Sequence, residues 1–192
     1  MAIHRVITTP GIYFVTFTCY EWLPLIDLAN GYDLVYKWFT VLSNAGHAIT
    51  GFVIMPNHIH ALLYYAGGRM NFNTIIGNGK RFMAYEIVNR LTISNQESLL
   101  KILKDAISLE EMRRGRHHQV WIESFDAKEC RTKGFILQKL NYIHNNPCSG
   151  NWQLADNPIH YPHSSASYYS NGVHTSYPVV DYRTLLRRVS SH

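Results

Sequence analysis

Runs of β-branched and aromatic residues predict the strands of this chain. Such runs occupy residues 12–19, 47–55 and 58–65, and a shorter one follows at 119–125. Only Pro56-Asn57 separates the second run from the third, which indicates a tight hairpin. The chain therefore begins with three strands and regains a fourth late in the sequence.

Apolar residues that recur every three or four positions predict three helices between these strands. The first two cover about residues 27–45 and 73–91, and the third covers about 127–146. Pro147 ends the third helix because proline and the residue before it both resist helical geometry. The buried candidates are Leu34, Val35, Trp38, Val41 and Leu42 in the first helix and Ile75, Ile76, Phe82, Ile87 and Val88 in the second.

The order strand, helix, strand, strand, helix, strand is typical of a ferredoxin-like βαββαβ fold. We expect an α+β domain over residues 1–192, with an antiparallel sheet and helices on one face. Residues 92–118 are predicted to be a helical insertion with one amphipathic helix, and residues 148–192 an irregular tail packed on the domain. Fold alone assigns no function, because this arrangement hosts many activities.

Composition narrows the partners and excludes some classes of site. Of the 192 residues, 46% are apolar and 16% charged, so the chain can bury a core. Lys and Arg number 18 against 13 Asp and Glu, for a net charge of +5, which is compatible with a nucleic acid but does not identify one. The three cysteines are widely spaced and form no CxxC pair, so the sequence suggests neither a disulfide framework nor a zinc site built from thiolates. With no apolar run near the length of a membrane span, we expect a cytosolic protein.

The segment PNHIHALL carries a candidate metal site. Alternate residues of a strand share a face, so His58 and His60 project together while Ile59 points to the core. Two imidazoles placed in this way can bind one divalent cation from one side. The same pattern also fits two ordinary histidines on a solvated face, and the motif alone leaves both interpretations open.

The segment KLNYIHNNP, residues 139–147, carries a candidate nucleophile. On the third helix, Gln138, Tyr142 and Asn146 recur every four residues and form a polar stripe beside the apolar one. A phenol with a pKa of about 10 needs help to become a nucleophile, and a nearby cation supplies it. The alternative is a surface tyrosine with Asn146 capping the helix. His144 lies two residues from Tyr142, on another face, and is not expected to be a ligand.

Together, PNHIHALL in a strand and YIHNNP on a later helix resemble the single-tyrosine histidine–hydrophobic–histidine (HUH) transposases. The likeness is greatest to the subgroup of REP-associated tyrosine transposases, and it extends over about residues 10–170. A lysine-bearing second helix, a strand containing Val120-Trp121 and the tail segment YPHSSASYY, residues 161–169, follow the same order as in that subgroup.

The resemblance implies a set of roles. His58, His60 and Asn146 would bind Mg²⁺ or Mn²⁺, and Tyr142 would attack single-stranded DNA with hairpin or repeat ends. The product would be a 5′-phosphotyrosine intermediate with a free 3′-hydroxyl, which another 3′-hydroxyl can resolve during transposition or mobilisation of REP-type repeats. Such a protein would act as a monomer or a homodimer, away from membranes.

Basic and aromatic residues outside this set are candidates for DNA contact. Lys80 and Arg81 lie where the resembling proteins present a basic residue to DNA, and Arg113, Arg114 and Arg116 form the densest basic run. A solvated helix face explains the first group equally well, and a charge run such as the second is usually only solvated. Tyr13, Trp22, Trp121 and Trp152 are able to stack on unpaired bases, although Trp121 and Trp152 fit a core better.

Two other functions remain open. A metal-dependent phosphoesterase would share the histidine pair, but a third alternating histidine is missing because residue 62 is leucine. A non-catalytic module that binds single-stranded nucleic acid is the second, although the strands lack the glycine–aromatic signature of RNA-recognition domains.

Overall fold

A four-stranded antiparallel sheet forms the centre of the protein, as predicted. The computed structural model describes residues 6–122, 126–150 and 152–189. The strand order is β2-β3-β1-β4, and each neighbouring pair is antiparallel, which is the ferredoxin-like arrangement. The strands are β1 (Gly11–Thr18), β2 (Ala48–Ile54), β3 (His58–Tyr65) and β4 (Asp126–Glu129).

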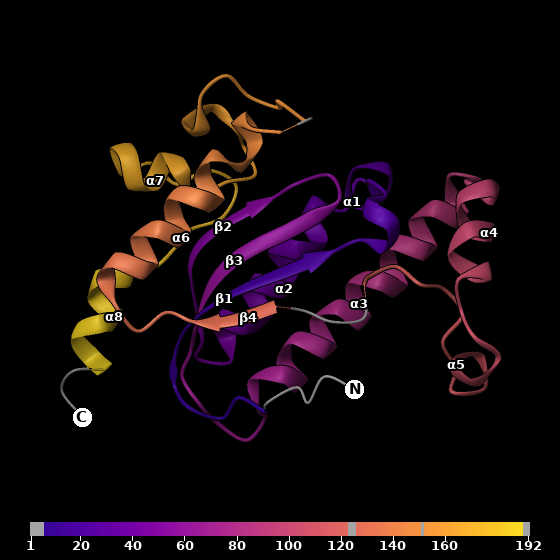
Figure 1. Ribbon diagram of the computed structural model, residues 1–192, viewed down its shortest axis with the longest axis horizontal. Coiled ribbons are helices and arrows are strands. Elements are labelled where there is room, and N and C mark those ends of the chain that lie inside the picture. The colour runs from indigo at the N-terminus through magenta and orange to yellow at the C-terminus, as the bar shows by residue number, and fades with distance from the viewer. Residues whose placement is uncertain (1–5, 123–125, 151, 190–192) are drawn as a thin grey trace.

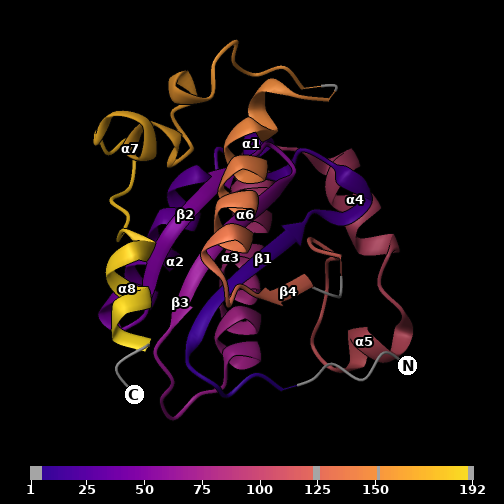
Figure 2. The same ribbon diagram turned by 60° about the vertical axis from the view of Figure 1, so that its left-hand side comes forward.

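The helices cover both faces of the sheet, which corrects the expectation of helices on one face. Helices α2 (Tyr32–Asn44) and α3 (Phe72–Ile93) lie behind the sheet, and α6 (Lys133–Asn145) crosses its front (Figures 1 and 2). The alternating residues of β1 explain why: Val15 and Phe17 join the core under α2 and α3, whereas Ile12 and Phe14 pack with α6 in a second cluster. The apolar run Ile12–Val15 in β1 is typical of a strand that is buried on both sides.

Two glycines permit the close approach of these helices. A Cβ atom on Gly51 would lie 2.5 Å from Leu140 of α6, and β2 carries an irregularity in register at this point. A Cβ atom on Gly79 of α3 would lie 2.3 Å from the indole of Trp38 on α2. Both positions need glycine because the neighbouring element occupies the space of a side chain.

The fourth strand and the third helix begin later than predicted. In the segment predicted as a strand, 119–125, Trp121 makes only an isolated bridge to Cys19, and residues 123–125 lie outside the described part of the chain. The sheet instead gains its fourth strand from Asp126–Glu129, which fell within the predicted helix. Thr132 caps α6 by accepting a hydrogen bond from the Phe135 amide, so the helix starts at Lys133.

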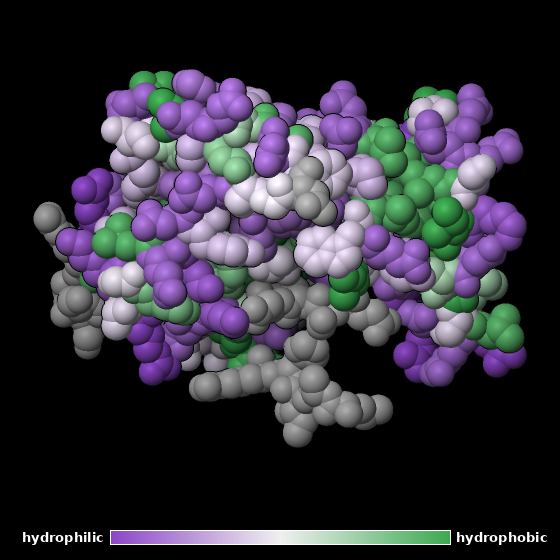
Figure 3. Space-filling view, turned by 45° about the horizontal axis from the view of Figure 1, so that its top comes forward, coloured by the Kyte–Doolittle hydropathy of each residue, from purple (hydrophilic) through white to green (hydrophobic). Residues whose placement is uncertain are grey.

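The predicted insertion holds two helices instead of one. They are α4 (Glu97–Asp105) and α5 (Leu109–Arg113), and α5 begins with a capping box between Ser108 and Glu111. Both lie at the end of the molecule farthest from α8 (Tyr182–Val189), and hydrophobic side chains gather toward the same end in Figure 3.

The described part of the tail packs along the outer edge of β2, as predicted, although it contains short helices within its irregular path. The Ile54 amide donates to the His163 carbonyl, and the Val180 amide donates to the Ile49 carbonyl. The tail thereby covers a sheet edge that would otherwise expose unpaired backbone groups. Besides α8 it contains α7 (Ala166–Asn171) and two 3₁₀ turns, Asn146–Cys148 and Pro158–His160.

Two expected core residues face the solvent instead. Val41 is 64% exposed and Phe82 is 63% exposed, because the contact between α2 and α3 runs through Trp38 and Gly79 on neighbouring faces. The remaining short elements precede α2 and are a 3₁₀ turn, Tyr20–Trp22, and α1 (Leu25–Leu28). Among the described residues, none of the helices combines the length and the hydropathy that crossing a bilayer requires.

Candidate active site

A cavity of about 400 Å³ lies where β1, β3 and α6 meet. It brings together His58, His60, Tyr142 and Asn146, the four residues predicted from the two motifs, within a single chain. The other residues that line it are Phe14, Thr16, Trp22, Lys128 and Lys139.

Asn57 and Trp22 hold His58 in place. The amide nitrogen of Asn57 donates to the Trp22 carbonyl at 3.0 Å, which leaves its Oδ1 to accept from His58 Nδ1 at 2.7 Å. His58 is therefore protonated on Nδ1 and carries its lone pair on Nε2. Glu21 and Trp22 both have positive φ angles, 49° and 58°, so the backbone is strained next to the site.

His60 is held in a similar way from the neighbouring strand. Thr16 lies opposite His60 in the register of β1 and β3, and its hydroxyl is 2.8 Å from His60 Nδ1. The ring stacks on Phe14 at 5.5 Å between centroids. With Nδ1 occupied by Thr16, Nε2 is the nitrogen available to a ligand.

The atoms that face one another in this cavity fit a divalent cation. His58 Nε2 lies 3.2 Å from Asn146 Oδ1, and both atoms are acceptors when His58 carries its proton on Nδ1. Adjacent ligands of an octahedral Mg²⁺, each at about 2.1 Å, are separated by about 3 Å, so the observed distance suits a shared metal. Two imidazoles and an amide oxygen also match the chemistry of Mn²⁺, which accepts nitrogen and oxygen ligands.

Burial keeps both imidazoles neutral. It lowers the pKa of His58 to about 4, opposed only by the hydrogen bond that a protonated Nε2 would donate to Asn146. It lowers the pKa of His60 to about 3, and the nearby positive charges of His58 and Lys139 add to the effect. A neutral imidazole is the form that binds metal, so both rings are ready to do so across the physiological pH range.

Tyr142 lies beside the histidine pair. Its ring is 5.1 Å from the His60 ring and 6.1 Å from Phe14, measured between centroids. The side chain is 51% exposed, and its hydroxyl has no hydrogen-bond partner within the described ranges. The phenol can therefore meet a substrate that enters from solvent without first breaking an internal bond.

Helical spacing explains one success and one failure of the sequence prediction. Tyr142 lies on α6 and Asn146 directly follows the helix as its C-terminal cap, and both line the cavity. Gln138, the third member of the predicted stripe, is exposed and does not line the cavity, whereas Lys139 does. Position 139 is three residues before Tyr142 and also faces it, so the i, i+3 relation was the available signal.

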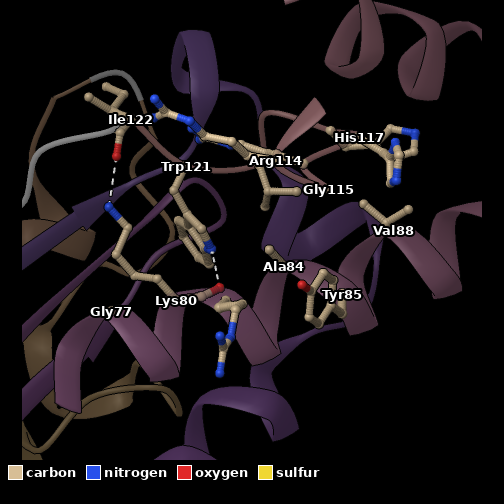
Figure 4. Close-up of a pocket in the computed structure, with 14 residues that line it drawn as sticks. Gly77, Lys80, Ala84, Tyr85, Val88, Arg114, Gly115, His117, Trp121 and Ile122 are labelled. Carbon is tan, nitrogen blue, oxygen red and sulfur yellow. Dashed lines mark hydrogen bonds between the residues drawn. The ribbon is translucent and has the colours of Figure 1, made fainter. Parts of the chain in front are cut away.

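Lys80 is buried away from this cavity. Its ammonium donates to the Ile122 carbonyl at 2.7 Å, and the Trp121 indole donates to the Lys80 carbonyl at 2.9 Å (Figure 4). Trp121 itself is only 4% exposed and belongs to the core. Both residues form the floor of a second cleft of about 960 Å³, between α3 and residues 114–122.

The predicted basic residues gather around this second cleft. Arg81, Arg114 and Arg116 line it, and Arg113 is exposed on α5 nearby. Arg114 and Arg116 also form ion pairs with Glu110 and Glu111 on α5, at 2.5 Å and 2.6 Å. The pair of Arg114 with Glu110 is largely exposed and contributes little, whereas the pair of Arg116 with Glu111 is partly buried.

The aromatic candidates divide into core and surface. Tyr13 is 3% exposed and donates to the Thr9 carbonyl, so it belongs to the core with Trp121. Trp22 is 59% exposed at the rim of the active-site cavity, 5.7 Å from the His58 ring, and Trp152 is 39% exposed on the tail. Trp22 is thus the aromatic residue placed to meet a substrate.

His144 is buried on the opposite side of α6 from the cavity. Its Nε2 lies 2.9 Å from the Ser165 hydroxyl, and Ser165 also accepts from the Phe52 amide of β2. Burial lowers the pKa of His144 to about 4. His144 therefore lies away from the cavity and joins α6 to the tail and the sheet.

Comparisons with known proteins identify the fold. No protein-family model matches the chain, and no curated protein matches it by sequence. A solved REP-associated tyrosine transposase bound to a REP hairpin is similar over 94% of this chain and 93% of its own, with a TM-score of 0.57 and 17% identity. A candidate transposase from Deinococcus radiodurans R1 aligns with 76% of this chain and 97% of its own, at 13% identity and a TM-score of 0.37. The first likeness shows a shared fold and supports the expected resemblance at that level.

Proposed function

We propose that this protein is a single-tyrosine HUH transposase that cuts and rejoins single-stranded DNA through Tyr142. The observation that carries the proposal is the meeting of Tyr142, His58, His60 and Asn146 in one cavity of one chain. A nucleophile and a metal site are each common, but together they match the requirements of metal-assisted phosphoryl transfer.

The residues have distinct roles in the proposed reaction. His58, His60 and Asn146 would bind Mg²⁺ or Mn²⁺, which polarises the scissile phosphate when bound. The Tyr142 oxygen attacks phosphorus and loses its proton to solvent, which reaches the half-exposed side chain. The bond from phosphorus to the 3′ oxygen breaks, and that oxygen takes up a proton as the 3′-hydroxyl. Tyr142 retains the 5′ phosphate until another 3′-hydroxyl attacks it.

The DNA partner follows from the site and from the similar protein. Trp22 at the rim offers an exposed ring on which an unpaired base can stack. The protein with the same fold was solved with a REP hairpin. We therefore propose a substrate that combines a hairpin with an adjacent single-stranded segment, processed during transposition or mobilisation of repeats.

Covalent capture of DNA tests the proposal. The probe is a set of single-stranded oligonucleotides that carry the repeats flanking the gene, labelled at the 3′ end in one sample and at the 5′ end in another. With Mn²⁺, the 3′ label is expected on the protein and the 5′ label on a released fragment, because the 5′ phosphate joins Tyr142. Tyr142→Phe should abolish the adduct, a loss of at least about 10³-fold, since it removes the nucleophilic oxygen.

The metal role has a separate test in the same assay. His58→Ala and addition of EDTA should each abolish the adduct, while fluorescence anisotropy shows that hairpin binding persists. Cleavage that survives EDTA would contradict the metal role. Cleaved DNA without an adduct would indicate a phosphoesterase, and binding without cleavage would indicate a non-catalytic module.

A further inference from the structure

Lys139 places a positive charge in the active-site cavity, and the proposed reaction gives this charge no role so far. Its Nζ lies 4.5 Å from the centroid of the Phe14 ring, 5.3 Å from that of Phe135 and 5.7 Å from that of Tyr142. Among the described residues, no carboxylate forms an ion pair with it. The ammonium is held by aromatic rings, whose faces attract a cation without neutralising it.

Helix α6 arranges this charge in line with the proposed chemistry. Phe135, Lys139, Tyr142 and Asn146 follow one another at spacings of four, three and four, so they form one stripe along the helix. Lys139 lies one turn before Tyr142, and Asn146 lies one turn after it. The nucleophile is thus flanked by an ammonium on one side and by the proposed metal ligands on the other.

We propose that Lys139 is a further catalytic residue, which binds a non-bridging oxygen of the scissile phosphate beside Tyr142. This inference rests on the proposed function, because it assigns a partner to Lys139 in that reaction. Phosphoryl transfer spreads negative charge over the equatorial oxygens and the leaving oxygen, and a preorganised cation in a half-buried site stabilises the charge on an equatorial oxygen. A purely structural role would not require charge, since an aliphatic chain fills the space between rings equally well.

Lys139→Met tests the charge while keeping the length and packing of the side chain. At saturating DNA, the rate of adduct formation should fall about 10²-fold, as for loss of one oxyanion donor. Binding of the hairpin probe should weaken by less than about threefold, because one phosphate contact among several is lost. Lys139→Arg should recover most of the rate. Lys133→Met, which removes an exposed lysine from the first turn of the same helix, is the matched control and should behave like the wild type.

A neutral substrate separates direct contact from a structural effect. With a methylphosphonate at the scissile position, the phosphate has no negative charge for Lys139 to meet, so the wild type and Lys139→Met should react at nearly equal rates. A ratio that stays near 10² on this substrate would overturn the inference, as would a Lys139→Met rate equal to that of Lys133→Met on normal DNA. If the wild type forms the adduct and either of these results is found, only the role of Lys139 is contradicted. If the wild type forms no adduct, the proposed function itself is contradicted.

Discussion

At the scale of single residues, the side chains behind the histidines decide what the histidines can do. Asn57 and Thr16 each engage an Nδ1 atom and thereby direct Nε2 of His58 and His60 toward ligands. Partners of this kind set the tautomer and orientation of a metal-binding imidazole. Asn57 is the turn residue between β2 and β3, so the hairpin that positions the pair also fixes the tautomer of one member.

Thr16→Val is expected to weaken metal binding without disturbing the fold. Valine has nearly the same shape but cannot hold His60 Nδ1, so affinity for Mn²⁺ should fall about 10-fold or more. The measurement is the Mn²⁺ concentration that gives half-maximal adduct, supported by direct Mn²⁺ binding followed by electron paramagnetic resonance. Thr92→Val, on the far end of α3, is the control. Equal Mn²⁺ affinity for both variants would show that Thr16 does not support the ligand.

At the scale of elements, α6 depends on its fit to β2 and the tail. Gly51 lets Leu140 approach the sheet, and His144 joins the helix to Ser165, which is bonded to Phe52. These contacts lie on the side of α6 opposite Tyr142. The position of the nucleophile is therefore set by packing on the face that takes no part in the chemistry.

The buried His144 makes stability depend on pH. Its pKa is about 4 in the folded protein and about 6.5 when unfolded, so the unfolded chain takes up the proton first. Its contribution is complete above about pH 6.5 and is lost as the pH falls toward 4, by up to about 3 kcal/mol. Urea unfolding of His144→Gln at pH 7.5 and 5.0 should show a smaller drop between the two values than the wild type does. An identical drop in both proteins would mean that His144 titrates normally.

Local sequence patterns predicted the helices and strands that bury one clear face. They failed for elements whose secondary structure depends on pairing or packing with distant segments. Residues 58–65 were predicted with their observed bounds, because turn residues and apolar alternation mark both ends of β3. β4 has the mostly polar sequence DAKE, and its strand geometry comes from pairing with β1. No local pattern of apolar residues therefore predicted it. α8 spans only eight residues, and its Tyr182 and Leu186 pack in the cluster that contains residues of α6.

The candidate site shows the same division. The histidine pair and the helix face of Tyr142 and Asn146 follow from spacing alone. Trp22 was a candidate for stacking, but its place at the rim of the cavity comes from a strained turn beside the hairpin. Thr16 was not a candidate, because its contact with His60 follows only from the register of β1 against β3.

At the scale of the whole molecule, the active-site cavity and the basic cleft lie next to one another. The segment that leads to Trp22 also borders the cleft, because the Tyr20 amide donates to the Val120 carbonyl and Cys19 bridges to Trp121. A DNA strand that passes Trp22 from the site would reach Arg114 and Arg116 on the far side.

Removing two charges from the cleft should weaken DNA binding in a way that depends on salt. For Arg114→Gln with Arg116→Gln, the slope of log affinity against log salt should decrease in magnitude by about 1.5, if each arginine meets one phosphate. Fluorescence anisotropy of the hairpin probe at several NaCl concentrations between about 50 and 200 mM measures this slope. Affinity changes strongly over this range when counterions are released, so the slope is well defined. The double variant Arg69→Gln with Arg183→Gln removes the same charge elsewhere and should leave the slope unchanged. Equal slopes for the two double variants would exclude the cleft as a phosphate-binding surface.

The placement of Tyr142 on the last turns of α6 and of Asn146 at its C-terminal cap has a consequence for the stoichiometry of strand exchange. On the proposed chemistry, each chain offers one covalent position, and the strand joined there stays against the metal ligands for as long as the bond lasts. A single molecule could not cut a second end until the first is released or passed on. Exchange between two DNA ends would then proceed either as an ordered relay on one chain or as a handover between two molecules, each carrying one end.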